Sequence, residues 1–471
     1  MSNTYRTIFR NSLALTGARF FSRVLQFFLF IYAARILGVD NFGIFSFGYV
    51  LVNMLGLTMD LGMSSYTIQQ VSRDYKKTSI YLGASLYARS FLIVLGYILI
   101  IGIGLIMGKD ELSMKVLFIL TTAEMLNNIE KSFDAVFRAH EKMYYLAITI
   151  SISNLVMTLM GFVLLFYSQD VLYYCYAILL GAFLRLLFGA YWCLKKFGAP
   201  SFEFDFNFIL QLLRKSFPFV VGGLFVTIYY NIDTIFLDIT EGKQTVAYYS
   251  AAYRLLEAPL FINTAIRSAL FPALSRLYKS NRDELGKVVS NFFYKELALG
   301  VSVAIIAAFL AEDIIRMIYG EEYILAARAL PILIFSLAII MPSTVCGVTI
   351  RAMDRQNVSA VIAGGGVVIN IILNLFFIPR YSYLGAAWAT LLTEFAMLCL
   401  NVKMVGQYTT IKILNAVYFG RLVMMGCSLL LFLYLMNNIG FWVQLVGSTL
   451  LILPIMLLTG IISIKDMKKM L

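Results

Sequence analysis

A line of polar and cationic side chains runs along the first apolar segment of the chain, residues 12–37. Its members, spaced by four, three, four and three residues, are Ser12, Thr16, Arg19, Arg23 and Gln26. This spacing places them on one face of a helix. At 1.5 Å per residue, Arg19 lies about 10 Å and Arg23 about 17 Å beyond Ser12, too deep to reach an interface easily. The segment contains no acidic residue, so this face can hold an anion in an aqueous cavity, unless neighbouring segments supply acids such as Asp60 or Glu124.

Two further segments carry charges at helical spacing. The stretch 247–275 contains Arg254, Glu257 and Arg267, together with two prolines that can break its regularity. The stretch 113–137 and the residue after it carry alternating acids and bases: Glu124, Asn128, Lys131, Asp134 and Arg138. Because opposite charges three or four residues apart meet on a helix, we expect this second stripe to be an internally paired network that holds its part of the protein together.

The elements that must position these charges are membrane-spanning helices. The chain has 471 residues, of which 61% are hydrophobic and 14% charged, against about 25% charged residues in a soluble chain. Apolar runs of about 20 residues, enough to cross a hydrocarbon core as a helix, recur from end to end. We predict an all-α integral membrane protein with fourteen spans: 12–37, 41–64, 80–107, 113–137, 143–167, 171–194, 217–238, 247–275, 288–310, 325–350, 356–378, 382–404, 413–436 and 439–463.

The distribution of lysine and arginine over the loops predicts the orientation. With the N-terminus inside, the inner segments carry 22 of these residues and the outer loops carry four, Lys109, Lys243, Arg316 and Arg380. Cytoplasmic loops are the basic ones, so both termini are expected in the cytoplasm. The net charge of +12 therefore reflects loops spread along the chain and does not indicate a nucleic-acid surface.

Two pairs of similar segments indicate an internal repeat. Residues 42–51 (FGIFSFGYVL) match 246–255 (VAYYSAAYRL), and 138–142 (RAHEK) match 351–355 (RAMDR). Both offsets correspond to six spans, which makes a parallel repeat of the kind that builds two-lobed transporters with a substrate site between the lobes. The predicted organisation is an N-terminal lobe (1–195), a cytoplasmic linker (196–216), a C-terminal lobe (217–406), and two extra spans with a tail (407–471).

Cysteine and histidine suggest no redox or metal chemistry. The five cysteines lie singly in apolar segments, and the single histidine, His140, lies in a charged loop. No disulfide framework or zinc motif is present in the sequence, and neither a metal nor another cofactor is expected.

Several motifs in a fixed order resemble a known family. They are AARILGVDNFGIFSFGYVL (33–51), MDLG (59–62), FRAHEKM (137–143), YYSAAYRLLE (248–257), FPALSRL (271–277), IYGEEY (318–323) and LGAAWATLLTE (384–394). Together they resemble the polysaccharide transporter family, the O-antigen or repeat-unit flippases, of the multidrug/oligosaccharidyl-lipid/polysaccharide superfamily. The resemblance covers essentially the whole chain. It implies two six-helix lobes, two C-terminal helices and a central cavity open alternately to each side of a bacterial inner membrane.

The resemblance also implies a substrate and a transport function. Members of this family move polyprenyl-diphosphate-linked oligosaccharides outward for polysaccharide assembly, where polymerase machinery is a further expected partner. Arginine binds phosphate oxygens bidentately, so the diphosphate candidates are Arg19, Arg23, Arg254 and Arg267. Arg254 matches an arginine of the related lipid-precursor flippases. Tyr229, Tyr230, Tyr249 and Tyr253 are candidates for sugar contacts, although interfacial belts explain most tyrosines in such chains.

Resetting an empty carrier of this kind can require an imported proton or sodium ion. Glu257 lies three residues after Arg254 on the same helix face and is the first candidate for the coupling residue. Glu394 and Asp60 are the reserve candidates. A permanent structural ion pair between Glu257 and Arg254 is an equally acceptable interpretation of the spacing.

Other function classes fit less well. A membrane glycosyltransferase or polymerase needs a sizeable extramembrane loop with catalytic carboxylates, and none is expected here, so no catalytic residue is assigned. A multidrug antiporter that binds cations needs an acidic cavity, whereas this chain places arginines there. A peptidoglycan-precursor flippase shares the anionic substrate and remains open.

Overall fold

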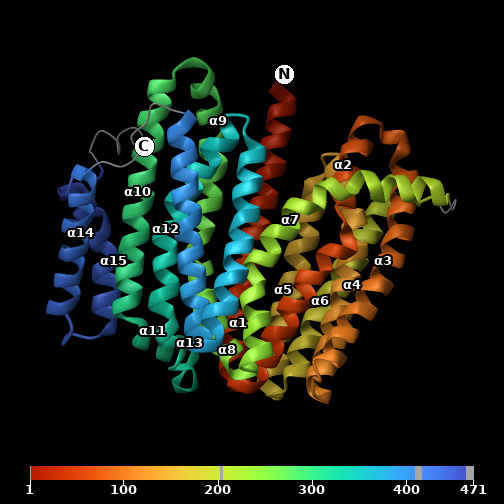
Figure 1. Ribbon diagram of the computed structural model, residues 1–471. Helices are drawn as coiled ribbons and strands as arrows, with labels where there is room; N and C mark the ends of the chain where they lie inside the picture. Colours follow the sequence, from red (N-terminus) through yellow and green to blue (C-terminus); the bar gives the residue numbers. More distant parts are fainter. Residues whose placement is uncertain (1, 202–204, 409–415, 463–471) are drawn as a thin grey trace. The chain divides into compact units, whose positions relative to one another are not determined.

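The computed structural model describes residues 2–201, 205–408 and 416–462, and over these ranges the chain is helical, without strands (Figure 1). The first half contains α1 (Ser2–Asp60), α2 (Met63–Arg73), the 3₁₀ turn η1 (Tyr75–Lys77), α3 (Thr78–Ile106), α4 (Glu111–Ala139), α5 (Met143–Tyr167), α6 (Val171–Phe197) and α7 (Phe206–Thr240). The second half contains α8 (Lys243–Glu257), α9 (Leu260–Ser280), α10 (Arg282–Phe309), α11 (Ala311–Tyr319), η2 (Glu321–Tyr323), α12 (Ala326–Ala352), α13 (Gln356–Tyr408), α14 (Ala416–Leu435) and α15 (Phe441–Leu458). The expected all-α class is confirmed.

Nine of the described helices are long and apolar enough to cross a membrane, or ten if the bent pair within α7 counts as one span. Two of them contain a sharp break. The break in α1 is at Gly38 (φ 69°), and the break in α13 is at Ser382 (φ 54°). Both lie where the sequence places a boundary between two spans, and each predicted span has a helix at its position. The count of fourteen and the orientation remain predictions.

The helices form two compact units, residues 1–235 (unit 1) and 236–471 (unit 2). The division lies within α7, later than the predicted lobe boundary at residue 217. The reason is that the linker and the start of α7 pack on unit 1. Ile209 and Leu212 of α7 are buried with Met63, Tyr66 and Tyr81 in one apolar cluster.

The corner between α1 and α2 shows why this packing is tight. Leu61 and Gly62 both have positive φ, 42° and 76°, a conformation that glycine adopts at little cost. A Cβ on Gly62 would lie 2.5 Å from the carbonyl oxygen of Ser216 in α7. The segment 206–213, which lies in the predicted linker, is therefore the docked first part of α7.

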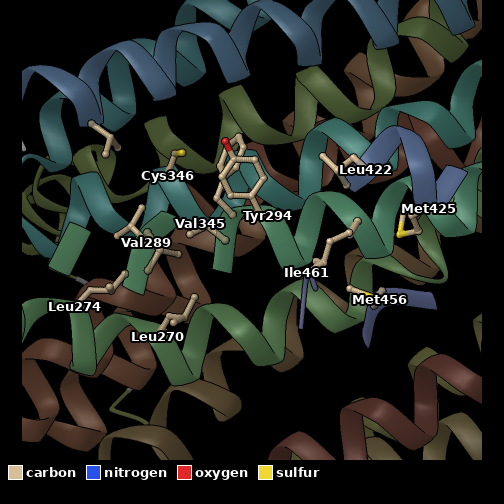
Figure 2. Packing of buried hydrophobic residues seen from close by; sticks show 14 of the residues in the cluster. Leu270, Leu274, Val289, Tyr294, Val345, Cys346, Leu422, Met425, Met456 and Ile461 are labelled. Atoms are coloured by element: carbon tan, nitrogen blue, oxygen red, sulfur yellow. The ribbon is translucent and has the colours of Figure 1, made fainter. Parts of the chain in front are cut away.

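Unit 2 has an extended apolar core, shown in Figure 2. Side chains of α9, α10 and α12 meet those of α14 and α15 there: Leu270, Leu274, Val289, Tyr294, Val345, Cys346, Leu422, Met425 and Met456. The rings of Tyr294 and Tyr418 stack at 4.3 Å. The two extra C-terminal helices are thus packed onto α10 as part of unit 2.

Candidate functional site: an unpaired cationic face and buried charge clusters

The polar face of α1 is present in unit 1. Arg19 and Arg23 are exposed, as is Thr16, and the side chain of Ser12 lies outside the described part of the structure. Gln26 donates a hydrogen bond to Asn154 of α5 at 3.0 Å. In the ranges that the structure describes, no carboxylate lies within 4 Å of Arg19 or Arg23. A cationic face of this kind has its full hydrogen-bonding capacity available for an anion.

The acids proposed as alternative partners of this face are engaged elsewhere. Asp60 forms an ion pair with Arg89 of α3, whose side chain is completely buried. The same guanidinium donates to the carbonyl oxygen of Asn128 at 2.6 Å and to Ser64 Oγ at 2.9 Å. Buried charges persist when they are paired and hydrogen-bonded, and Asp60 supplies that pairing for Arg89. A coupling role of Asp60 remains a prediction.

Glu124 is likewise paired along α4. Its Oε1 lies 3.3 Å from Lys131 Nζ and accepts a hydrogen bond of 2.8 Å from Asn128 Nδ2. The same Lys131 ammonium donates to Asn128 Oδ1 at 3.2 Å. The predicted internal pairing of the α4 stripe is confirmed for Glu124, Asn128 and Lys131.

A second cluster on α4 involves Glu130, a residue that the sequence interpretation did not select. Arg185 of α6 lies between two carboxyl groups, with Nε 3.1 Å from Glu130 Oε2 and Nη2 3.2 Å from Asp134 Oδ2. Arg138 Nη2 is 4.0 Å from Asp134. Glu130 is fully buried and packs against Gly189 of α6, where a Cβ would lie 3.3 Å from Glu130 Cγ. The i, i+4 spacing from Glu130 to Asp134 was the available signal.

The cationic face of α1 lies within electrostatic reach of this second cluster. Arg19 interacts electrostatically with Asp134 and Arg138 of α4 and with Arg185 of α6, as well as with Arg23. An anion bound at Arg19 therefore changes the electrostatic potential at the Glu130 and Asp134 carboxyl groups.

In unit 2, Arg254 and Glu257 form an ion pair at the end of α8. Arg254 Nη1 is 2.9 Å from Glu257 Oε2, and both side chains remain partly exposed. The predicted proximity is thus observed, and an ion-coupling role remains a prediction. Helix α8 ends at Glu257 and α9 begins at Leu260 after Pro259, so the pair lies beside a break.

Arg267, the remaining phosphate candidate, is exposed on α9. Its charge acts on Arg351 at the end of α12, and within the described ranges neither arginine has a carboxylate in ion-pairing range. Arg351 donates to Ser359 Oγ at 3.3 Å. Two uncompensated arginines within electrostatic reach of each other favour a nearby anion.

The tyrosines proposed for sugar contact differ in how deeply their side chains are buried. Tyr249 is 2% exposed, shares a 3.2 Å hydrogen bond with Thr390 and stacks on Tyr253. Its assignment to sugar contact is not supported in this conformation, because its ring is part of the core of unit 2. Tyr229 and Tyr230 pack edge to face, and Tyr230 is exposed, so Tyr230 presents the most surface to a ligand.

The buried acids of unit 2 include Glu394 and Glu296. Glu394 is buried in α13, and its coupling role remains a prediction. Glu296 of α10 was not selected from the sequence. It is 6% exposed, and among the described residues no group donates to it or forms an ion pair with it.

Comparison with known proteins identifies the class of molecule. The model of the family "Polysaccharide biosynthesis protein" matches residues 8–278, more than half of the chain, and the MatE family model matches residues 218–376. The chain belongs to the polysaccharide biosynthesis protein family, within the superfamily that its motifs resemble. With its apolar helices, it is a multi-pass membrane protein.

Individual relatives are distant in sequence. The capsular polysaccharide biosynthesis protein CapF of Staphylococcus aureus is 23% identical over 62% of this chain and 74% of its own length. The probable low-salt glycan biosynthesis flippase Agl15 of Haloferax volcanii is 23% identical over 86% of this chain and 84% of its own length. Among solved structures, the lipid II flippase MurJ in an inward closed conformation aligns with a TM-score of 0.79 at 17% identity, covering 95% of this chain and 98% of MurJ. At this identity, the likeness establishes a shared fold.

Proposed function

We propose that this protein is a flippase that translocates polyprenyl-diphosphate-linked oligosaccharide repeat units from the inner to the outer leaflet of a cell membrane by alternating access. Family membership supports the polysaccharide pathway, and relatives that are named as glycan flippases support translocation. Both termini are placed in the cytoplasm on the charge bias of the loops. The protein acts as a carrier and not as a catalyst, and it delivers its cargo to polymerase machinery on the outer side.

The observation that carries the proposal is the exposed pair Arg19 and Arg23 on α1, with no carboxylate in contact in the described part of unit 1. A diphosphate is a compact anion, and two guanidinium groups one helical turn apart can each bind phosphate oxygens bidentately. A cationic drug, by contrast, would be repelled there. Arg254 and Arg267 are proposed as the corresponding phosphate contacts in unit 2, and Tyr230 as a sugar contact.

A deletion strain tests the function. We expect loss of one surface glycan and accumulation of the full-length lipid-linked repeat unit on the cytoplasmic side, with normal peptidoglycan synthesis and viability. Loss of viability with accumulated peptidoglycan precursor would instead assign the chain to that pathway. Normal levels of every surface glycan would contradict the proposal.

Complementation tests the residues. Plasmids encoding Arg19→Ala and Arg23→Ala should fail to restore the glycan although the proteins reach the membrane in normal amounts. Arg316→Ala is the matched control, because Arg316 pairs with Asp313 and Glu321 outside the proposed site. Lysine at position 19 should restore only part of the export, because an ammonium group lacks the bidentate fork.

A further inference from the structure

The carboxyl groups of Glu130 and Asp134, here called the carboxyl pair, form an unusual arrangement in unit 1. They lie one turn apart on α4, and both contact the guanidinium of Arg185, Glu130 Oε2 at 3.1 Å from Nε and Asp134 Oδ2 at 3.2 Å from Nη2. Two ionised carboxylates held against one guanidinium repel each other strongly unless one of them is protonated.

The surroundings of the carboxyl pair leave space for that proton. Within the described ranges, Glu130 Oε1, Glu130 Oε2 and Asp134 Oδ1 are buried and accept no hydrogen bond from another group. The one hydrogen bond from a neighbouring helix is donated by Arg185 Nη2 to Asp134 Oδ2 at 3.2 Å. Buried acceptors without donors are costly, and one shared proton gives the pair a donor.

The charges that face the carboxyl pair come from four helices. Arg185 of α6 contacts both acids, and Arg138 of α4 lies at 4.0 Å from Asp134 with its side chain one-third exposed. Arg89 of α3 acts on both acids but is committed to Asp60. Arg19 of α1 acts on Asp134. Helix α5 contributes no charged residue.

We propose that Glu130 and Asp134 form a proton-binding site that shares one proton, and that this site is linked to anion binding at Arg19. With one proton bound, the pair carries a single negative charge, which matches Arg185, the guanidinium that contacts both acids. An anion arriving at Arg19 adds negative potential and increases the proton affinity of the pair. By linkage, proton binding increases the affinity for the anion to the same extent.

The linkage between the carboxyl pair and an anion at Arg19 rests on the proposed function, whereas proton binding by the carboxyl pair does not. Proton binding and its linkage to the anion are therefore measured in separate experiments. The first measurement is infrared spectroscopy of the carboxylic acid C=O stretch in reconstituted protein, titrated through neutral pH. An E296Q background removes a further buried acid for which the described residues provide no partner. The matched control is E124Q, which removes an acid from the same helix that is paired with Lys131.

In this background, we expect E130Q to abolish a carboxylic acid band that E124Q leaves in place, and D134N to shift or abolish the same band. Absence of any such band, or a band that survives both E130Q and D134N, would overturn the proposed site. Thermal unfolding of each variant shows whether the protein is folded during the measurement.

The second measurement is proton uptake in weakly buffered solution on addition of a short-chain polyprenyl diphosphate. We expect uptake by the wild type and by E124Q, and its loss in E130Q and in R19Q. Binding without proton uptake would overturn the linkage. Absence of diphosphate binding together with a band sensitive to E130Q would count against the proposed function and leave the proton site standing.

Discussion

The described residues of the two units make different kinds of contact, although the sequence predicts that the two halves of the chain are repeats. Unit 1 holds buried or half-buried charges in contact: Asp60 with Arg89, Glu124 with Lys131, and Glu130 and Asp134 with Arg185. The described core of unit 2 joins α9, α10, α12, α14 and α15 through apolar side chains. In the described residues, ion pairs between helices therefore stand out in unit 1, and the extended apolar core stands out in unit 2.

The largest expected effect is on unit 1. Arg89→Ala removes a completely buried guanidinium and leaves Asp60, whose side chain is 15% exposed, without its counter-ion. Breaking a buried pair in this way costs up to about 3–5 kcal/mol. We expect poor accumulation, or a strongly lowered midpoint of thermal unfolding in detergent. Near-normal stability of this variant would contradict a stabilising role of the pair between Asp60 and Arg89. Replacement of both Asp60 and Arg89 by apolar residues should recover much of the loss.

We expect substitutions that create a cavity in the apolar core of unit 2 to lower its stability. Leu429 of α14 is completely buried in the apolar core, and Leu429→Ala should cost about 2–5 kcal/mol through lost contacts and the cavity left behind. Limited proteolysis should show release of α14 and α15 first. The exposed neighbour Leu430 is the matched control, and Leu430→Ala should have little effect. Equal effects of the two variants would remove packing as the explanation.

The ion pair between Arg254 and Glu257 is expected to contribute little to stability. Both side chains are partly exposed, and exposed pairs contribute about 0–1 kcal/mol. Glu257→Gln should therefore fold normally while changing the response of transport to an imposed proton or sodium gradient. A full response to both gradients in this variant would exclude Glu257 as the coupling residue and leave it a structural partner of Arg254.

The smallest effect concerns His140, which lies outside the spans between the rings of Tyr75 and Phe197. Burial, followed by the charge of Lys142, lowers the pKa of His140 below its ordinary value. The folded state therefore binds its proton more weakly than the unfolded chain, whose pKa is about 6.5. The stability of unit 1 should be unaffected well above that pH and fall slightly as the pH drops through it. His140→Phe keeps the ring contacts and should remove this decline in thermal unfolding measured between about pH 7.5 and 5.5.

Much of this architecture follows from the sequence, because span length and loop charge act locally. The breaks at Gly38 and Ser382 lie where the apolar runs were divided, and the paired stripe of α4 follows from helical spacing. The partners of individual charges did not follow in the same way. Arg89 and Arg185 lie in the predicted spans 80–107 and 171–194, but their acids lie on other helices, and only the three-dimensional packing brings them together.

The location of the boundary between the two units could not be predicted from the sequence either. The polar segment 196–216 has the composition of a linker, yet Ile209 and Leu212 bury apolar surface against α2 and α3. Glu130 was overlooked for a related reason, because it is out of register with the stripe that contains Glu124 and Asn128. Its burial depends on Gly189 of α6, whose missing side chain admits the carboxyl group.

The most direct test of the central claim is a flipping assay with purified protein in liposomes. Lipid-linked oligosaccharide is supplied on both leaflets, and the fraction that becomes accessible to a membrane-impermeant glycosidase is measured over time. The account predicts rapid exposure with wild-type protein and with Arg316→Ala, and exposure at the protein-free rate with the double variant Arg19→Ala/Arg23→Ala. Wild-type exposure by the double variant would contradict the claim that the cationic face of α1 binds the transported anion.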